Sequence, residues 1–177
     1  IHLGFNMPYI DMSPEPKNEI KTFMRIGYDF NSAIADIVDN SITAKATKIN
    51  IICPSEIDNP FLSIVDNGIG MGPEELIQNM RIGCKDPNVK REAGDLGRFG
   101  SGMKTASFSH ARRLTVISKK KGKKLAGACW DIDEIEEKNT WCLRVLSQQD
   151  IKNFNHFDKD LMTGAGTQLV WEKIRKF

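Results

Sequence analysis

The chain has 177 residues, of which 40% are hydrophobic, and this is enough apolar material for one well-buried core. The formal net charge is +2, from 25 basic and 23 acidic residues. This near-balance argues against a surface dedicated to binding a polyanion.

The four cysteines show neither CxxC spacing nor nearby histidine clusters. This pattern disfavours structural zinc and favours reduced thiols, so we expect a cytoplasmic protein. No apolar run approaches the roughly 18 residues of a membrane span, and no signal peptide is visible, so no membrane association is expected.

The first stretch, residues 1–14, is predicted to be irregular because it contains Pro8 and Pro14. The chain begins with Ile1 and stops after "WEKIRKF" without a polar tail. We therefore expect a fragment of a longer protein, with one domain over residues 15–177.

Two helices are predicted next along the chain. "PEPKNEIKTFMRIG" forms a helix closed by Gly27, and Asp29 is placed to cap a helix over about 30–45. The apolar residues of the second helix recur at helical spacing, which predicts a buried stripe. The stripe consists of Phe30, Ile34, Ile37, Val38 and Ile42.

The remaining elements alternate between strands and helices. "KINIIC" and "FLSIVD" are typical of neighbouring strands, and "GPEELIQNMRIG" of a helix that starts near Pro73 and closes at Gly83. Residues 84–99 are polar and predict a mobile loop, a candidate lid over about 84–102. A helix follows from "GSGMKTASFSHA", then come strands in "RLTVIS", "KLAGACWDI" and "WCLRVL", a short helix at 148–156 and a last strand in "GTQLVWEKI". The sum predicts an α/β (α+β) two-layer sandwich, a mixed, mostly antiparallel sheet backed by helices.

The helix over 30–45 carries the first candidate site. Asp36 and Asn40 are four residues apart, so their side chains lie on one helix face. A carboxylate can orient or deprotonate a water, and an amide oxygen can bind a hard cation such as Mg²⁺. The alternative is that both simply solvate a polar face.

"DNGIGMG", residues 66–72, follows an apolar strand and breaks into glycines. Asp66 can accept a hydrogen bond from an exocyclic amine such as that of adenine, Met71 offers a soft contact for a ring, and Gly68 and Gly70 allow close backbone approach. The alternative is an ordinary Asx turn.

Two further glycine-containing turns complete the set. "GRFGSGMK", residues 97–104, precedes a helix whose free N–H groups can face an anion, with Lys104 adding positive charge. "GAGT", residues 164–167, puts the Thr167 hydroxyl just before a strand, where a hairpin turn is the alternative.

Taken in order, the four motifs resemble those of the Bergerat-fold ATPases, the superfamily of gyrase, ninety-kilodalton chaperones, histidine kinases and MutL, known as GHKL. The resemblance covers roughly residues 20–172. "DNSITAKATKINI" and "GRFGSGMKTASFSHARRLTVIS" resemble MutL and the Microrchidia ATPases more than the kinases.

The resemblance implies the Bergerat fold, with ATP and Mg²⁺ as ligands. Asp36 would orient the attacking water, Asn40 would hold Mg²⁺, Asp66 would receive the adenine amine, and Thr167 would share a water beside the ring. Gly68, Gly70 and Met71 would form the pocket floor, and Lys85 would be a γ-phosphate sensor. The remaining nucleotide contacts would come from Gly97, Arg98, Phe99, Gly100, Ser101, Gly102, Met103 and Lys104.

The sequence departs from the family pattern at two positions. Hydrolytic members usually carry glutamate where this chain has Asp36, whose oxygen falls about 1 Å short, and misplacement of that order costs roughly a hundredfold in rate. Thr43 stands where many relatives have an aspartate.

Three functions follow from the resemblance. The leading one is slow ATP hydrolysis in a nucleotide-gated switch or clamp that dimerises with ATP in the full-length protein. The second is a non-hydrolysing nucleotide sensor, and the third is a histidine-kinase catalytic domain.

Basic residues concentrate in 111–124, which offers nonspecific DNA contact or, alternatively, a solvated hairpin.

Overall fold

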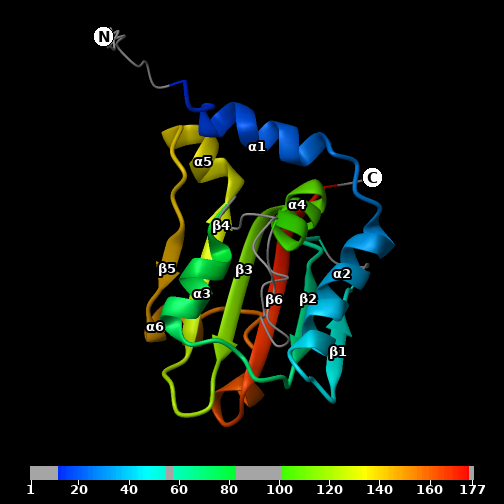
Figure 1. Ribbon diagram of the computed structural model, residues 1–177, viewed down its shortest axis with the longest axis vertical. Helices are drawn as coiled ribbons and strands as arrows, with labels where there is room; N and C mark the ends of the chain where they lie inside the picture. Colours follow the sequence, from blue (N-terminus) through cyan, green and yellow to red (C-terminus); the bar gives the residue numbers. More distant parts are fainter. Residues whose placement is uncertain (1–11, 55–57, 83–100, 176–177) are drawn as a thin grey trace, which may run out of the picture.

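A six-stranded antiparallel sheet forms one layer of the protein and helices form the other (Figure 1). The computed structural model describes residues 12–54, 58–82 and 101–175. The described strands lie in the spatial order β1-β2-β6-β3-β4-β5, and each pairs antiparallel with its neighbours. They are β1 (Ile49–Ile52), β2 (Leu62–Asp66), β3 (Ala111–Lys119), β4 (Ala126–Asp131), β5 (Arg144–Leu146) and β6 (Gly166–Ile174). This confirms the predicted two-layer α/β fold.

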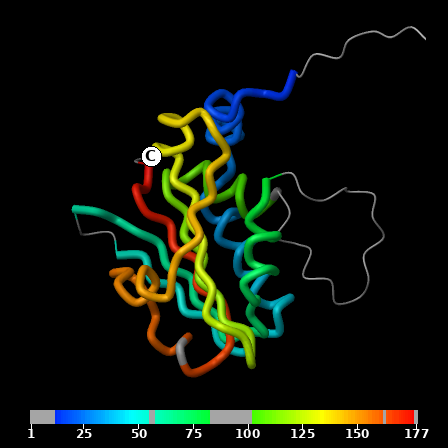
Figure 2. Tube along the Cα trace, turned by 90° about the vertical axis from the view of Figure 1, so that its left-hand side faces the viewer, coloured from blue at the N-terminus to red at the C-terminus, as the bar shows by residue number. Residues whose placement is uncertain are grey.

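Three helices cover one face of the sheet. In Figure 1, α2 (Phe30–Thr43) lies over β2, α4 (Ser101–His110) over β3 and β6, and α3 (Pro73–Met80) over β4. Helix α1 (Pro16–Arg25) crosses the end of this layer and packs against α4 and α5 (Ile132–Lys138). Figure 2 shows the sheet from its edge, with α2 and α3 on the same side of it.

The main core lies between the sheet and these helices. Alternate strand residues such as Leu62 and Ile64 of β2, Leu114 of β3 and Trp171 of β6 point into it, as the two-residue period of a strand requires. The opposite face holds a smaller cluster, in which Ile151 of α6 (Gln148–Lys152) packs with four other buried residues. These are Val65, Ile117, Leu125 and Leu161, the last from the short 3₁₀ helix η1 (Lys159–Met162).

Local sequence signals predicted the end of α1 and the starts of α2 and α3. Asp29 caps α2 by accepting a hydrogen bond from the backbone N–H of Ser32 at 3.0 Å. Gly27, just after α1, adopts φ +69°, and Pro73 is the first residue of α3.

Several element predictions were wrong in detail. Helix α2 ends at Thr43 rather than near 45, and Ile42 is 59% exposed instead of buried. The buried residues of α2 are Ala33, Ile37, Asn40 and Ser41. The helix therefore turns polar groups toward the sheet, which the apolar periodicity did not predict.

Helix α5 and η1 were not predicted at all. Ile132 looked like the end of a strand, but Asp131 ends β4 and caps α5 by accepting from the backbone N–H of Asp133. Trp141 lies outside β5, although it packs against Phe23 and Trp130 as a core-edge residue. In the parts of the chain that the structure describes, no helix combines the length and apolar character that a bilayer crossing requires.

Candidate functional site

Three polar residues form a row across neighbouring strands on the helix-covered face of the sheet. Thr167 of β6 pairs in register with Asp66 of β2 on one side and with Ser118 of β3 on the other. Their side chains lie on the same face as Leu169 and Ile64, which belong to the main core. All three are at most 7% exposed, so the row is a buried polar cluster inside an apolar layer.

Asp66 is the acceptor at the centre of this cluster. Its Oδ1 accepts from the backbone N–H groups of Gly68 at 2.8 Å and Thr167 at 3.3 Å. Its Oδ2 accepts from the hydroxyl of Ser41 on α2 at 2.9 Å. Burial raises the pKa of Asp66 above its ordinary value, and these hydrogen bonds offset the effect only in part.

The bond from Ser41 brings α2 and the Asp66 turn together. Asn40, next to Ser41, is 5% exposed, and in the described part of the chain its carboxamide makes no hydrogen bond. A buried carboxamide without a partner among the described residues can bind a ligand, because most buried amides are paired. The predicted metal ligand and the predicted adenine acceptor therefore belong to one region.

Ser118 is the residue that sequence reasoning missed. Its hydroxyl oxygen accepts from the backbone N–H of Met71 at 2.8 Å and lies 2.8 Å from the Thr167 hydroxyl and 3.0 Å from the Gly166 carbonyl oxygen. It thus joins the turn after β2 to the start of β6. The only local sign in the sequence was its place in an alternating strand.

Three glycines make this close approach of turns possible. A Cβ on Gly70 (φ +63°) would lie 1.9 Å from the Lys119 carbonyl oxygen, and a Cβ on Gly166 (φ +148°) would lie 2.0 Å from the Asp66 carbonyl oxygen. A Cβ on Gly68 would lie 2.7 Å from the Ala44 carbonyl oxygen. Any side chain at these positions would push the turns apart.

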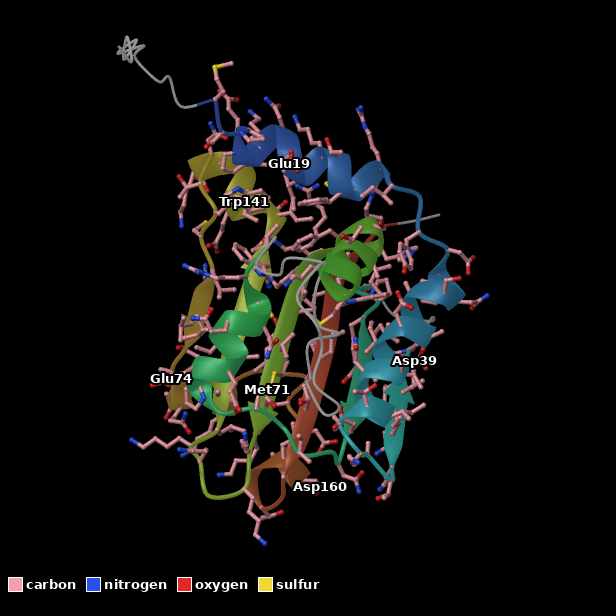
Figure 3. The ribbon with its side chains drawn as sticks, in the orientation of Figure 1. Glu19, Asp39, Met71, Glu74, Trp141 and Asp160 are labelled. Carbon is pink, nitrogen blue, oxygen red and sulfur yellow. The ribbon has the colours of Figure 1, made fainter. Side chains whose placement is uncertain are left out.

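Met71 lies at the connection between β2 and α3 (Figure 3). It is 2% exposed, and the Asn79 side-chain amide donates to its sulfur at 3.3 Å. The sulfur is therefore held by α3, and the predicted floor role of Met71 stays a prediction.

A cavity of about 10 Å³ lies between α2 and the sheet, which is room for about one water. Its polar lining comes from Ser41, Asp66 and Thr167, and its apolar lining from Ile37, Ile64, Val116 and Leu169. The predicted water beside Asp66 and Thr167 stays a prediction.

Asp36 lies on α2, one turn before Asn40, and accepts a hydrogen bond at Oδ2 from the Tyr28 hydroxyl. The same oxygen is 3.8 Å from where a Cβ on Gly102 would lie, in the first turn of α4. The structure therefore brings the predicted catalytic carboxylate to the N-terminal end of α4.

Lys104 is 2% exposed and points its ammonium toward the end of α3. It donates to the carbonyl oxygen of Asn79 at 2.8 Å and to that of Arg81. These bonds satisfy carbonyls at the C-terminal end of that helix, where positive charge is favourable. The predicted phosphate contact of Lys104 stays a prediction.

The other predicted contacts of this segment are only partly described. Met103 is buried in the main core, and Ser101 begins α4. Lys85, Gly97, Arg98, Phe99 and Gly100, with most of the candidate lid, lie outside the described residues.

A much larger cavity, of about 840 Å³, lies between α1, α3, α4 and β4. Phe23, Ile77, Phe108 and Trp141 give it an apolar lining, and Lys104 borders it. None of Asp36, Asn40 and Asp66 lines it, so it is separate from the polar cluster.

The basic stretch 111–124 divides into two parts in the structure. Arg112 pairs with Asp133 and Glu136, and Arg113 pairs with Asp131, at the start of β3. The lysines lie at the other end of β3 and in the turn that follows it. At the lysine end, Lys120 pairs with Glu75 at 2.6 Å, so part of the positive charge there is matched by a carboxylate as well.

Comparison with known proteins gives one matching family model and several curated relatives. Residues 28–164 match the model described as "Histidine kinase-, DNA gyrase B-, and HSP90-like ATPase". The chain is 33% identical over 91 residues to ATPase morc-1 of Caenorhabditis elegans, which covers 51% of this chain and 10% of that protein. It is 32% identical over 91 residues to ATPase MORC2B of Mus musculus, and this match covers 50% of this chain and 9% of that protein.

A chaperone is also similar. Chaperone protein HtpG of Rickettsia prowazekii is 31% identical over 109 residues, covering 56% of this chain and 17% of that protein. The alignments thus span less than a fifth of each of these relatives.

Proposed function

Because the chain belongs to the histidine kinase-, DNA gyrase B- and HSP90-like ATPase family, we propose that it binds ATP with Mg²⁺ and hydrolyses it slowly. Family membership supports ATP binding and possible hydrolysis. The observation that carries the proposal is the buried Asp66 carboxylate, joined to Ser41 of α2 and Thr167 of β6.

Asp66 is suited to select adenine. Oδ1 is occupied by two backbone donors, whereas Oδ2 has one donor, Ser41, and a further lone pair. A buried acceptor favours the 6-amino group of adenine and rejects the 6-oxo group of guanine, because two acceptors facing each other lose a hydrogen bond.

The donor set around Asn40 fits Mg²⁺. In the described residues no cluster of three or more His, Cys, Asp or Glu side chains forms a ready-made metal cage. Mg²⁺ commonly takes one or two protein oxygens and completes its shell with phosphate and water, and the unpaired Asn40 amide supplies one such oxygen. When bound, Mg²⁺ would neutralise negative charge on the triphosphate.

Asp36 is the acid available for hydrolysis. Its carboxylate orients a water, accepts a proton from it as the oxygen attacks the γ-phosphorus, and ADP leaves as the P–O bond breaks. The N-terminal end of α4 beside Asp36 is a favourable place for phosphate charge. An aspartate reaches less far than a glutamate, which supports a slow rate.

Slow turnover suits a switch, in which the bound nucleotide controls dimerisation of the whole protein. The relatives that carry the word ATPase in their names are much longer than the matched segment, so this role is proposed for the parent protein. Nonspecific DNA contact through the lysine end of residues 111–124 and a cytoplasmic location are parts of the same proposal.

A non-hydrolysing sensor is the second candidate. It is favoured by the residue at position 36, an aspartate whose carboxylate is shorter by one methylene than that of the usual glutamate. In this case ATP binds with Mg²⁺ but no phosphate is released.

Calorimetry with ATP and Mg²⁺, followed by single-turnover phosphate release, tests both candidates. Asn40→Ala should abolish magnesium-dependent affinity, and Asp36→Ala should retain affinity but lose hydrolysis. Asp39→Asn, an exposed change on the same helix (Figure 3), is the matched control. It should leave both the magnesium-dependent ATP affinity and the hydrolysis rate unchanged. No ATP affinity in the wild type would overturn the proposal, and affinity without phosphate release would favour the sensor.

A further inference from the structure

The Tyr28 side chain connects the segment before α2 with the acid on that helix. Its hydroxyl donates to Oδ2 of Asp36, eight residues further along the chain. Among the described residues, no other side chain donates a hydrogen bond to the Asp36 carboxylate.

Tyr28 is itself held in place. Its ring packs against the edge of the main core, and the next residue, Asp29, fixes the start of α2 through its cap to Ser32. A donor fixed at both ring and backbone loses little entropy when it orients a partner. Asp36, by contrast, is a half-buried side chain that can otherwise rotate about two bonds.

The hydrogen bond also decides which carboxylate oxygen is available. Oδ2 is shared with Tyr28 and lies beside Gly102 at the start of α4. Oδ1 remains as the acceptor for a water. An aspartate that is short by one methylene gains most from being held in a single orientation, because fewer of its rotamers reach the water.

We propose that Tyr28 is a positioning residue for hydrolysis, which orients the Asp36 carboxylate so that one oxygen accepts a proton from the attacking water. This inference rests on the proposed function. Tyr28 contacts neither nucleotide nor metal in this scheme, and it acts only through Asp36. The raised pKa of the Tyr28 phenol, caused by its hydrogen bond to Asp36, by burial and by the carboxylate charge, agrees with a close contact.

A double-mutant cycle on hydrolysis tests the role. Tyr28→Phe should lower kcat about tenfold, less than the roughly hundredfold cost of a 1 Å misplacement, and leave the Kd for ATP unchanged within about twofold. In an Asp36→Ala background the same change should have no further effect on the rate, because its target is gone. Ser109→Ala removes a part-buried hydroxyl on α4 that contacts Phe23, and serves as the control with unchanged kcat.

An unchanged or faster rate in Tyr28→Phe would overturn the inference. An equal loss in both backgrounds would do so too, since a general structural effect is additive. If the wild type hydrolyses ATP while either of these results is found, the positioning role of Tyr28 fails and the proposed function stands. Failure of the inference is therefore distinguishable from failure of the proposed function.

A second measurement needs no nucleotide. Tyr9 and Tyr28 are the two tyrosines of the chain, so Tyr9→Phe leaves Tyr28 as the one phenol seen by ultraviolet titration. Adding Asp36→Asn should lower the pKa of Tyr28, because the carboxylate charge that opposes phenolate is lost. An unchanged phenol pKa would contradict the contact and overturn the inference. If the wild type neither binds nor hydrolyses ATP, both the function and the positioning role fail, whatever the phenol reports.

Discussion

The side-chain oxygens of Ser118 and Thr167 lie 2.8 Å apart on neighbouring strands, at the point where β3 and β6 pair in register. Through this contact the turn after β2 and the turn before β6 become one unit, because Ser118 also holds the backbone N–H of Met71. The hydroxyl of Thr167 therefore points toward β3, where Ser118 lies. The backbone N–H of Thr167 points toward β2, where it donates to Asp66.

Replacing Ser118 by alanine should weaken ATP binding as well as the fold. The change leaves the N–H of Met71 without its partner, which costs about 1–3 kcal/mol of unfolding free energy. Ser107→Ala, which removes the acceptor of the Trp171 indole N–H at 2.8 Å, should cost a similar amount without altering ATP affinity. Urea unfolding and calorimetry of both variants check this, and equal affinity losses would contradict it.

Asp66→Asn should separate recognition from folding. The amide oxygen can keep the two backbone donors, while its NH₂ group replaces the acceptor Oδ2 and faces the adenine amine. We expect ATP affinity to fall about a hundredfold, the cost of losing a charged hydrogen bond. Circular dichroism should be unchanged, and retention of wild-type affinity would refute the role of Asp66.

The same variant should also change how stability depends on pH. Because burial raises the folded-state pKa of Asp66, the folded protein binds the proton more tightly than the unfolded chain. This residue therefore makes stability fall as pH rises from the ordinary carboxyl value of 3.8 through the raised one. Unfolding free energies of Asp66→Asn, measured across that window, should lack this decline.

Two glycines with positive φ provide a matched steric comparison. Gly70→Ala places a Cβ 1.9 Å from the Lys119 carbonyl oxygen, so it should lower the unfolding free energy by about 3 kcal/mol or more. Gly122→Ala meets nothing within 4 Å and should cost about 1 kcal/mol from backbone strain alone. Chemical denaturation checks the difference, and equal losses would show that the turn can relax.

Acid should weaken the ion-pair cluster at the start of β3. Burial alone would raise the pKa of Asp131, but hydrogen bonds from Arg113 and Lys173 outweigh it and hold the pKa below its ordinary value. The stabilisation is therefore present above the ordinary value of 3.8 and is lost as pH falls through the lowered one.

Asp131→Asn tests this without removing the helix cap, because an amide oxygen can still accept from the Asp133 N–H. We expect it to lose about 2 kcal/mol at neutral pH and correspondingly less on acidification than the wild type. An identical acid response in both proteins would exclude Asp131 as a source of the pH dependence.

Local signals in the sequence predicted most of the elements that carry the site. The cap at Asp29, Gly27 after α1, Pro73 at the start of α3 and the turn after Asp66 each depend on a few neighbouring residues. Where local signals were weak, prediction failed. Helix α5 is only seven residues long and starts directly from β4, so Ile132, its first residue, looked like the end of that strand.

The exposed Ile42 shows a different limit. Periodicity identifies a helix, but it does not say which face meets the sheet. Here the buried face of α2 includes Asn40 and Ser41, because Ser41 has a buried partner in Asp66, 25 residues away.

By itself, the sequence determined most of the helices and strands that bear the motifs and the family resemblance, since these depend on residue type and short spacing. The residues proposed to bind adenine, metal and water are predictions from the same motifs. Only the tertiary structure decided that Ser118 joins Thr167, that Tyr28 meets Asp36, and that the Lys104 ammonium sits on the end of α3. These contacts come from strand register and helix packing. Residues between 8 and 49 positions apart in the chain become neighbours there, and no local pattern encodes such contacts.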